Sequence, residues 1–290
     1  MRVLLTGVTG YLGSHLATEL LKEGHEVIAL KRKLSSLNRI QVILPRLVLY
    51  NLEETNLAEL FAGFGKFDAV IHTATCYGRN GESISQIAEA NLLFPLKLLE
   101  AAVFGNVDVY INTDTALDKL LNPYTLSKGQ FSEWGKYFAH QEKIRFINLR
   151  LEHFYGAGDD DSKFTTHVIN SCLANVPYLN LTLGEQRRDF IYIDDAVSAY
   201  LLLLKKRNSF QDWFIDFEVG SGVAVTIRQF VETVHSLTAS TTRLNFGALP
   251  YRAGEAMLSQ ANTAALKLLG WQCRHELAEG LRMTIKGTRE

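Results

Sequence analysis

The sequence predicts an α/β protein with a doubly wound parallel sheet and a smaller C-terminal lobe. Short apolar strands alternate with helical stretches through the first 150 residues, which is typical of a parallel sheet. The opening strand runs directly into a glycine-rich turn and a helix. Beyond residue 150 the pattern loosens. We therefore expect residues 1–150 to form the first domain, with a return to it around residues 188–222, and residues 151–290 to form mostly the lobe.

Composition excludes several functional classes. The chain has 290 residues and a net charge of −1, which offers no electrostatic case for binding nucleic acid or an anionic membrane. Its three cysteines are widely spaced and include no C-x-x-C pair, which argues against a disulfide framework or a metal site. The chain opens on a strand, and its apolar runs are too short to span a bilayer. We expect a soluble protein of the reducing cytoplasm.

The glycine turn predicts a dinucleotide site. Residues 1–6 form an apolar strand, the glycines follow, and leucines from Leu12 to Leu20 recur on one helical face. Gly7 permits the tight turn, Gly10 lets a pyrophosphate approach the backbone, and Gly13 lets the helix pack on the strand. An ordinary glycine turn is the alternative, but the strand before and the helix after favour a cofactor site with phosphates at the helix N-terminus. The predicted contacts are Gly7, Thr9, Gly10, Tyr11, Leu12 and Gly13.

Basic residues follow the second strand, predicted over residues 26–30. An acidic residue there would bind the adenine-ribose hydroxyls of NAD, whereas cations accommodate the extra phosphate of NADP. Lys31 and Arg32 stand there together with Lys33, and no acid does. A solvated charge run is the alternative, but we favour NADPH/NADP⁺, with Arg32 as the main contact. After a third strand at residues 46–50, Asn51 and Leu52 are expected to border the adenine.

Three further strands are predicted at residues 67–71, 108–111 and 145–149. The first of them runs into Thr73, Ala74 and Thr75, whose small side chains would let the backbone approach the cofactor's ribose and pyrophosphate. His72 is equally consistent with packing, and we assign it no chemistry. A helical stretch at residues 84–104 should be kinked or divided by Pro95. Helices in the C-terminal half are expected at residues 164–173, around 201–204, and at 226–237, 263–269 and 277–285.

Tyr124 and Lys128 are the candidate catalytic pair. They are four residues apart at the start of a helical stretch, so both side chains lie on one face. A neighbouring ammonium and an oxidised nicotinamide would lower the pKa of the phenol, which could then exchange a proton with a ketone oxygen. With eleven tyrosines in the chain, a chance Tyr-x-x-x-Lys is the alternative.

Polar residues at the end of the fifth strand strengthen the catalytic interpretation. Thr113 is placed to hydrogen-bond the same substrate oxygen that Tyr124 would protonate. Asp114 and Thr115 follow it and are expected to touch the sugar or to orient the other groups. A strand-ending turn has much the same composition. The combination with the glycine loop and the Tyr124/Lys128 pair favours the functional interpretation.

The motifs together resemble those of the extended short-chain dehydrogenases/reductases. These are Thr6-Gly7-x-x-Gly10-x-x-Gly13, Tyr124-x-x-x-Lys128 and Arg188-Asp-Phe-Ile-Tyr-Ile-Asp194-Asp195, and they cover essentially the whole chain. More narrowly, residues 72–78, 112–114, 150–156 and 184–186 are similar to the CDP-abequose and CDP-paratose synthases. That resemblance implies a Rossmann fold, a substrate-binding lobe, and NADPH-dependent reduction of the C4 ketone of a CDP-3,6-dideoxyhexulose for the O-antigen of lipopolysaccharide.

The resemblance also implies site residues. It makes Thr113, Tyr124 and Lys128 the catalytic set, with the last two also contacting the cofactor. It further implies that Arg187 or Arg188, and Arg252, hold the nucleotide diphosphate. The expected substrate contacts are Thr75, Asp114, Thr115, His153, Lys163, Arg187, Arg188, Arg252 and Glu255. A homodimer is expected, with residues 84–104 and 125–140 as candidate contacts, although core packing explains those apolar stripes equally well.

One departure from the wider family bears on the reaction. Nucleotide-sugar 4,6-dehydratases of this superfamily carry Thr-Asp-Glu here, and the glutamate is the base for elimination. This chain has Thr115 in place of that glutamate. Ketone reduction needs no such base, so the sequence favours a reductase.

Two alternatives stay open. A nucleotide-sugar 4-epimerase would use the same groups but retain NAD, which the basic residues after the second strand disfavour. A cofactor-binding regulator without catalysis would have no need of the Tyr124/Lys128 pair. Neither the stereochemistry at C4 nor the base of the nucleotide follows from the sequence.

Overall fold

The computed structural model describes residues 1–252 and 254–289, which divide into two compact units. The first unit contains Met1–Arg150 and Val197–Phe217. The second contains Leu151–Ala196 and the chain from Glu218 onward. The assignment of the cofactor to the first unit and of the substrate to the second stays a prediction.

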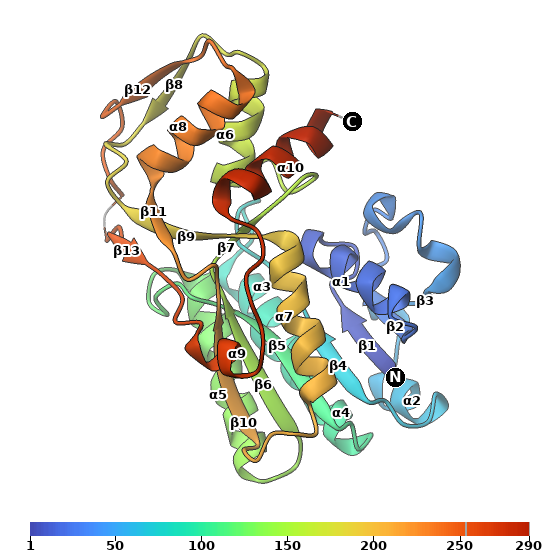
Figure 1. Ribbon diagram of the computed structural model, residues 1–290. Coiled ribbons are helices and arrows are strands. Elements are labelled where there is room, and N and C mark those ends of the chain that lie inside the picture. Colours follow the sequence, from blue (N-terminus) through green and yellow to red (C-terminus); the bar gives the residue numbers. More distant parts are fainter. Residues whose placement is uncertain (253, 290) are drawn as a thin grey trace. The chain divides into compact units, whose positions relative to one another are not determined.

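A seven-stranded parallel sheet forms the centre of the first unit (Figure 1). In chain order its strands are β1 (Arg2–Thr6), β2 (Glu26–Lys31), β3 (Val48–Asn51), β4 (Ala69–His72), β5 (Val109–Thr115), β6 (Arg145–Leu151) and β10 (Phe214–Val219). Across the sheet the order is β10-β6-β5-β4-β1-β2-β3. Because β1 pairs in parallel with both β2 and β4, the strand order reverses at β1. Open α/β sheets bind ligands at the carboxyl edge of this position. The predicted doubly wound fold is confirmed.

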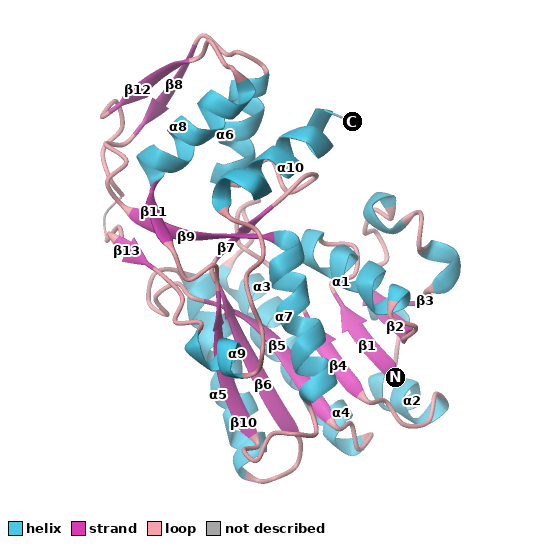
Figure 2. Cartoon of the chain, viewed as in Figure 1, coloured by secondary structure: helices cyan, strands magenta, loops and turns pink. Residues whose placement is uncertain are grey.

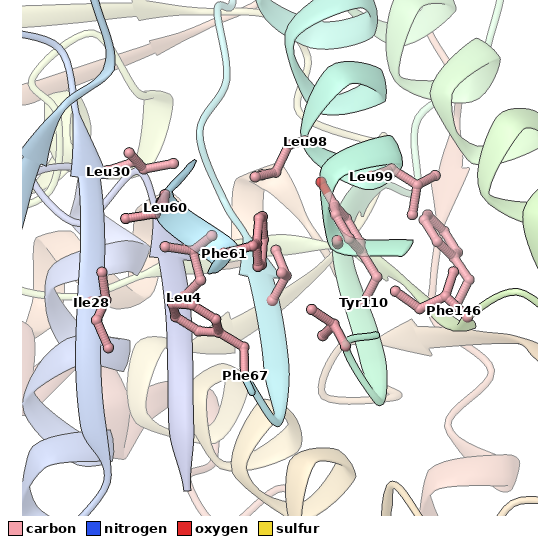
Figure 3. Packing of buried hydrophobic residues seen from close by; sticks show 14 of the residues in the cluster. Leu4, Ile28, Leu30, Leu60, Phe61, Phe67, Leu98, Leu99, Tyr110 and Phe146 are labelled. Atoms are coloured by element: carbon pink, nitrogen blue, oxygen red, sulfur yellow. The ribbon is translucent and has the colours of Figure 1, made fainter. Parts of the chain in front are cut away.

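Helices cover both faces of this sheet (Figure 2). They are α1 (Tyr11–Lys22), α2 (Leu57–Gly63), α3 (Ile84–Ala88), α4 (Phe94–Phe104), α5 (Pro123–His140) and α7 (Ile193–Lys206), with short 3₁₀ turns η1 (Asn38–Ile40), η2 (Leu44–Arg46) and η3 (Leu52–Glu54). On one face α2, α4 and α5 bury an apolar core against the strands, in which Phe61 packs edge-on against Phe67 and Tyr110 stacks on Phe146 (Figure 3). On the opposite face lie α1 and α7 (Figure 1). The core fixes the helices that carry the candidate site.

The stretch at residues 84–104 is divided as its proline predicts. A π-helical turn, η4 (Glu89–Leu93), separates α3 from α4, and Pro95 lies in the first turn of α4. Proline has no N–H, so it cannot donate to the carbonyl four residues earlier, and the backbone widens just before it. The wider turn contains Asn91, whose side chain is completely buried.

β10 was not expected from the sequence. Its residues alternate between apolar side chains and the acids Asp216 and Glu218, so it lacks the continuous apolar run of a central parallel strand. The reason is its position at the edge of the sheet, where only one neighbour, β6, pairs with it.

The second unit is a smaller α/β assembly. Its strands are β7 (His153–Tyr155), β8 (Tyr178–Leu181), β9 (Arg187–Tyr192), β11 (Ala224–Thr226), β12 (Arg243–Phe246) and β13 (Leu258–Ser259), and its helices are α6 (Phe164–Leu173), α8 (Ile227–Thr238), α9 (Ala264–Leu268) and α10 (Leu277–Arg289). β9 pairs with β7, β11 and β13, while β8 and β12 form a separate two-stranded sheet. None of the helices in the described residues combines the length and the hydropathy needed to cross a bilayer.

Candidate active site

The glycine loop between β1 and α1 has no room for side chains. Gly7 has a φ of +73°, and a Cβ there would lie 2.7 Å from the backbone nitrogen of Ala74. A Cβ on Gly13 would lie 2.0 Å from the carbonyl oxygen of Gly7. The sequence suggested that Gly13 lets α1 pack on the strand, whereas the atoms nearest to it belong to Gly7 and Val8 of the turn. The loop is a tight cradle that only glycine can form at these two positions.

The N-terminus of α1 presents backbone donors. Gly10 is the N-cap residue, and no side chain accepts a hydrogen bond from the first turn of the helix there. Thr9 precedes this cap, and Tyr11 and Leu12 are buried in the first helical turn. A helix that begins on bare glycine keeps its N–H groups and dipole end for an anion. The described residues of the loop thus fit a bound phosphate.

The ends of β2 and β3 are joined by a side-chain contact. The Lys31 Nζ donates to the Asn51 Oδ1 over 2.9 Å, and it also donates to two backbone carbonyls of its own loop. Leu52 follows directly and begins η3. Asn51 therefore orients Lys31 at the carboxyl edge of the sheet.

Arg32 and Lys33 differ in their surroundings. The Lys33 Nζ lies 2.5 Å from the Glu54 Oε1, and this carboxylate raises the pKa of the exposed lysine. Arg32 is exposed, and no ion pair is found for it within residues 1–252 and 254–289. The guanidinium is therefore the cation in this loop that is available to a further phosphate.

Beyond β4 the chain is held close to β1. The Thr73 hydroxyl donates to the Thr6 carbonyl over 2.8 Å, and the Ala74 backbone N–H donates to the Thr6 hydroxyl. The buried Asn91 then binds the next loop: its Oδ1 accepts from the Cys76 N–H over 2.8 Å and from the Thr75 hydroxyl. The three small residues after β4 are therefore fixed beside the glycine turn.

Lys128 is the most unusual charged group of the first unit. α5 begins at an N-cap, Asn122, whose side chain accepts from the Thr125 N–H, and Lys128 lies on the second turn of this helix. Its side chain is 2% exposed, and its Nζ makes no hydrogen bond or ion pair with the described residues. Burial lowers the pKa of Lys128 to about 8, although nearby Asp114 acts in the opposite direction. The ammonium is available to a ligand hydroxyl.

Tyr124, one turn before Lys128, has a pKa that differs from the prediction. Burial raises the pKa of the phenol well above its usual value, Tyr77 and Asp114 raise it further, and the Thr115 side chain opposes them. The expectation that Lys128 lowers this pKa is wrong for the polypeptide by itself, because lost hydration dominates. The phenol is thus protonated at neutral pH and can act as a proton donor.

Two residues that the sequence did not single out cover the phenol. The Tyr77 ring lies 4.9 Å from the Tyr124 ring between centroids, and the Arg79 guanidinium lies 4.7 Å above the Tyr77 ring. Arg79 also lowers the pKa of Tyr124, against the larger effect of burial. The contacts of Arg79 with Tyr77 and of Tyr77 with Tyr124 restrict the orientation of the candidate proton donor.

Thr113 and Asp114 belong to separate hydrogen-bonded groups. The Thr113 hydroxyl lies 2.7 Å from the hydroxyl of Tyr200 on α7. Asp114 is buried; its Oδ1 accepts from the Thr115 N–H and its Oδ2 from the Asn148 amide. The same amide donates to Asp216 over 2.9 Å. The carboxylate of Asp114 is therefore held in place at the end of β5, beside Lys128.

The candidate substrate residues of the second unit are only partly brought together. The Lys163 Nζ pairs with the Asp159 Oδ2 at 2.9 Å, and the His153 ring packs edge-on against Phe190. Arg187 is exposed and donates to the Ala224 carbonyl over 2.7 Å.

Two other candidates of this unit do form a pair. The buried Arg188 is ion-paired with Glu255. Arg252 is exposed and lies in the same loop as Glu255, whose N–H donates to the Arg252 carbonyl over 3.1 Å. Arg188 and Glu255 thus form one charged group, and the others stand apart from it.

The acids of the motif at residues 188–195 hold the second unit together. Asp189 is fully buried and accepts hydrogen bonds from the backbone of Ser221, Gly222 and Ala261. Asp195 likewise accepts from the backbone N–H groups of residues 274 and 275. Each carboxylate closes loops that have no secondary structure of their own, so the motif is structural at these two positions.

The buried ammonium predicts an unusual stability profile. A lysine whose pKa falls from 10.5 to about 8 on folding binds its proton less readily in the folded state. Stability is therefore reduced by at most about 3 kcal/mol below pH 8, and the loss is relieved as the pH rises from 8 to 10.5. We expect Lys128→Met to increase the free energy of unfolding at pH 7, and the gain to shrink at pH 9.5. Urea denaturation at both pH values measures it.

The matched control for this prediction is Lys143→Met, at an exposed lysine of the same unit. It should leave the free energy of unfolding unchanged at both pH values. A Lys128→Met protein that is less stable than the parent at pH 7 would contradict the buried, unpaired ammonium.

Known proteins resemble this chain along most of its length. The family model described as "NAD dependent epimerase/dehydratase family" matches residues 3–220. A CDP-abequose synthase of Salmonella typhimurium is 33% identical over 292 residues, covering 98% of this chain and 97% of its own. A second, of Salmonella muenchen, is 35% identical with the same coverage. A UDP-glucose 4-epimerase of Lactobacillus helveticus is 25% identical over 95% of this chain and 93% of its own.

Solved structures share the fold. The crystal structure of UDP-glucose 4-epimerase from Thermotoga maritima with UDP-glucose has a TM-score of 0.84 at 22% identity, covering 100% of this chain and 99% of its own. The structure of MoeE5 in complex with UDP-glucose and NAD has a TM-score of 0.85 at 25% identity with the same coverage. The chain therefore belongs to the NAD dependent epimerase/dehydratase family of extended short-chain dehydrogenases/reductases.

Proposed function

We propose that the protein is an NADPH-dependent 4-ketoreductase that converts a CDP-4-keto-3,6-dideoxyhexose to CDP-abequose or CDP-paratose for O-antigen synthesis. Two relatives that bear the name CDP-abequose synthase match 98% of the chain. The observation that carries the proposal is the pair on α5: a buried lysine without a partner, one turn after a tyrosine whose pKa is raised. Such a pair serves proton transfer beside a bound cofactor.

The residues of the first unit fit a nicotinamide dinucleotide. The side-chain-free glycine loop and the uncapped start of α1 suit its pyrophosphate. Thr73, Ala74 and Thr75 bring backbone close to the same turn. Lys128 has an unsatisfied ammonium that suits the hydroxyls of a ribose. Two of the structural relatives were solved with NAD, which supports this class of cofactor. When bound, the cofactor supplies the hydride.

The chain's own residues manage the proton. Tyr124 stays protonated at neutral pH and donates its proton to the C4 oxygen while that carbon is reduced. Thr113 donates a hydrogen bond to the same oxygen. Lys128, charged below about pH 8, stabilises the phenolate that remains. Ketone, hydride and proton together give the secondary alcohol.

The residue after Asp114 favours reduction over elimination. Thr115 has no carboxylate, and its side chain lies near enough to the Tyr124 phenol to lower the pKa of that group. The nearest acid, Asp114, already accepts hydrogen bonds from the Asn148 amide and from a backbone N–H. A base that could remove a proton from a sugar carbon is therefore missing from this strand end among the described residues.

The cationic loop after β2 supports NADP(H). Lys31 is oriented by Asn51, while Lys33 is engaged by Glu54. Arg32 is the exposed guanidinium that would bind the additional phosphate, with the bidentate geometry that this group offers.

In the second unit we propose that Arg187, Arg188 and Arg252 serve the nucleotide diphosphate, and that His153, Lys163 and Glu255 line the sugar site. Arg187 and Arg252 are exposed, whereas Arg188 is buried and ion-paired with Glu255. In the first unit, Asp114 and Thr115 are the proposed sugar contacts. These contacts, and the predicted cytoplasmic location, stay predictions.

An epimerase is the second candidate, because UDP-glucose 4-epimerases recur among the relatives. The two activities differ in stoichiometry. A reductase consumes one NADPH for each sugar converted, whereas an epimerase consumes none. Purified protein incubated with NADPH and CDP-4-keto-3,6-dideoxyglucose, followed by absorbance and by product stereochemistry, separates them.

We also propose a homodimer that uses the helices α3 to α5. Five large apolar side chains on these neighbouring helical segments are exposed to solvent: Ile84, Leu93, Leu126, Trp134 and Tyr137. Because a two-fold axis presents the same surface twice, one such patch is sufficient for a self-complementary interface.

Replacing the proton donor should abolish turnover without affecting the cofactor. Tyr124→Phe keeps the ring and its contact with Tyr77 but has no proton to give, so kcat should fall at least about 100-fold. The Kd for NADPH should change little. Tyr137→Phe, at an exposed tyrosine of the same helix, is the control. Near-normal turnover by Tyr124→Phe would exclude the phenol as the donor.

Removing the exposed guanidinium should change the choice of cofactor. Arg32→Ala deletes a charge-assisted contact to the 2′-phosphate, and we expect the Kd for NADPH to rise about 10- to 100-fold. The Kd for NADH should stay the same. Lys33→Ala is the comparison, and its effect should be smaller because Glu54 holds that ammonium. Equal weakening of both cofactors by Arg32→Ala would contradict the NADP assignment.

A charge placed on the exposed α5 surface should disrupt the dimer. Trp134→Glu would bury a carboxylate twice in a symmetric interface, so we expect a monomer by sedimentation velocity. Leu268→Glu, at an exposed leucine of α9, is the control and should leave the mass unchanged. An unchanged dimer for Trp134→Glu would place the interface elsewhere, and a monomeric parent would contradict the proposal itself.

A further inference from the structure

A second tyrosine, Tyr200, contacts the candidate site from α7. It is completely buried, and its hydroxyl lies 2.7 Å from the Thr113 Oγ1. In the described residues neither hydroxyl has another hydrogen-bond partner. Burial raises the pKa of Tyr200, and the neighbouring Tyr77 and Asp114 raise it further. The phenol therefore keeps its proton, and either hydroxyl could donate in the hydrogen bond between Tyr200 and Thr113.

We propose that Tyr200 is a positioning residue for the reduction: it donates its proton to the Thr113 Oγ1 and thereby directs the Thr113 proton to the C4 oxygen of the substrate. The inference rests on the proposed ketoreductase function. It assigns Tyr200 no direct contact with substrate or cofactor.

The direction of the hydrogen bond follows from the number of protons. A threonine hydroxyl has one proton to donate and can accept on its oxygen. If Thr113 donated to Tyr200, its oxygen would offer the ketone no donor. If Tyr200 donates instead, the only proton of Thr113 is available to the ketone. Successive hydrogen bonds also polarise one another, so the Thr113 hydroxyl becomes a stronger donor.

Tyr124 and Tyr200 have different roles although burial raises the pKa of both. Tyr124 retains partial exposure, as a group that meets the substrate must. Tyr200 has none, and its hydroxyl is in contact with Thr113. It can reach the reacting oxygen only through that threonine.

A double-mutant cycle tests the proposal. The parent, Tyr200→Phe, Thr113→Val and the double variant are compared in kcat and KM with NADPH and CDP-4-keto-3,6-dideoxyglucose. We expect Tyr200→Phe to lower kcat about five- to tenfold with an unchanged KM for NADPH. In the Thr113→Val background, Tyr200→Phe should have no further effect. Equal losses in the two backgrounds, or an unchanged kcat for Tyr200→Phe, would overturn the proposal.

Tyr110→Phe is the matched control. Tyr110 is also fully buried in the first unit, but its hydroxyl has no hydrogen-bond partner in the described residues. Removing it should leave kcat unchanged. A loss as large as that of Tyr200→Phe would mean that any buried phenol has this effect, and would contradict the specific role.

A Thr113→Ser background sharpens the test. Serine keeps the hydroxyl but lacks the β-methyl group that restricts χ1, so Tyr200 becomes its main restraint. Tyr200→Phe should then lower kcat more in Thr113→Ser than in the parent. If Tyr200→Phe does not fold, 3-fluorotyrosine at position 200 replaces it, since its more acidic phenol should raise kcat in the parent and not in Thr113→Val. The same kcat change in both backgrounds would contradict the inference.

The failure of this inference differs from that of the proposed function. A parent protein that does not consume NADPH with the ketosugar contradicts the function. In that case the cycle is measured on urea unfolding free energies, which need no substrate. Additive effects there would show that the Tyr200–Thr113 hydrogen bond is not formed, and would overturn the inference as well.

Discussion

A lysine ammonium buried without a partner is the constraint on which the first unit depends. The charged form of Lys128 loses its hydration, and only the carboxylate of Asp114 offsets part of that loss. Such a group persists because the structure around it is over-determined: a capped helix holds it, and an apolar core fixes that helix against the sheet. Because no side chain among the described residues pairs with this ammonium, its charge is available to bind a ligand.

Around this cation, the side chains at the end of β5 are either protonated or already hydrogen-bonded. The phenols of Tyr124 and Tyr200 are neutral, and Asp114 is fixed by the Asn148 amide, which also holds Asp216. A site with neutral donors and one cation suits a reaction in which an oxygen gains a proton. It does not suit one that begins by removing a proton from carbon.

The sequence predicted the parts of the site that local spacing specifies. The glycine turn and the pair Tyr124/Lys128 are each contained in a few residues, as are the strands that carry them. Tyr200 and Asp216 could not be found in this way, since they reach β5 from segments distant in sequence. In the polypeptide by itself the pKa of Tyr124 is raised rather than lowered, which the sequence could not show because spacing reveals the neighbouring charge but not the depth of burial. Asn91 did carry a signal, as an amide within an apolar helical stretch just before Pro95.

The π turn at Glu89–Leu93 fixes the length of the chain as well as its shape. This π turn contains one residue more than a regular α-helical turn. The extra residue turns the Asn91 amide toward the backbone of Cys76, in the loop after β4. A deletion that restored regular helical phase would rotate this amide away, and the loop after β4 would lose the hydrogen bonds that Asn91 makes with it. Substitutions at the exposed positions of this segment should therefore be tolerated, whereas insertions and deletions should not.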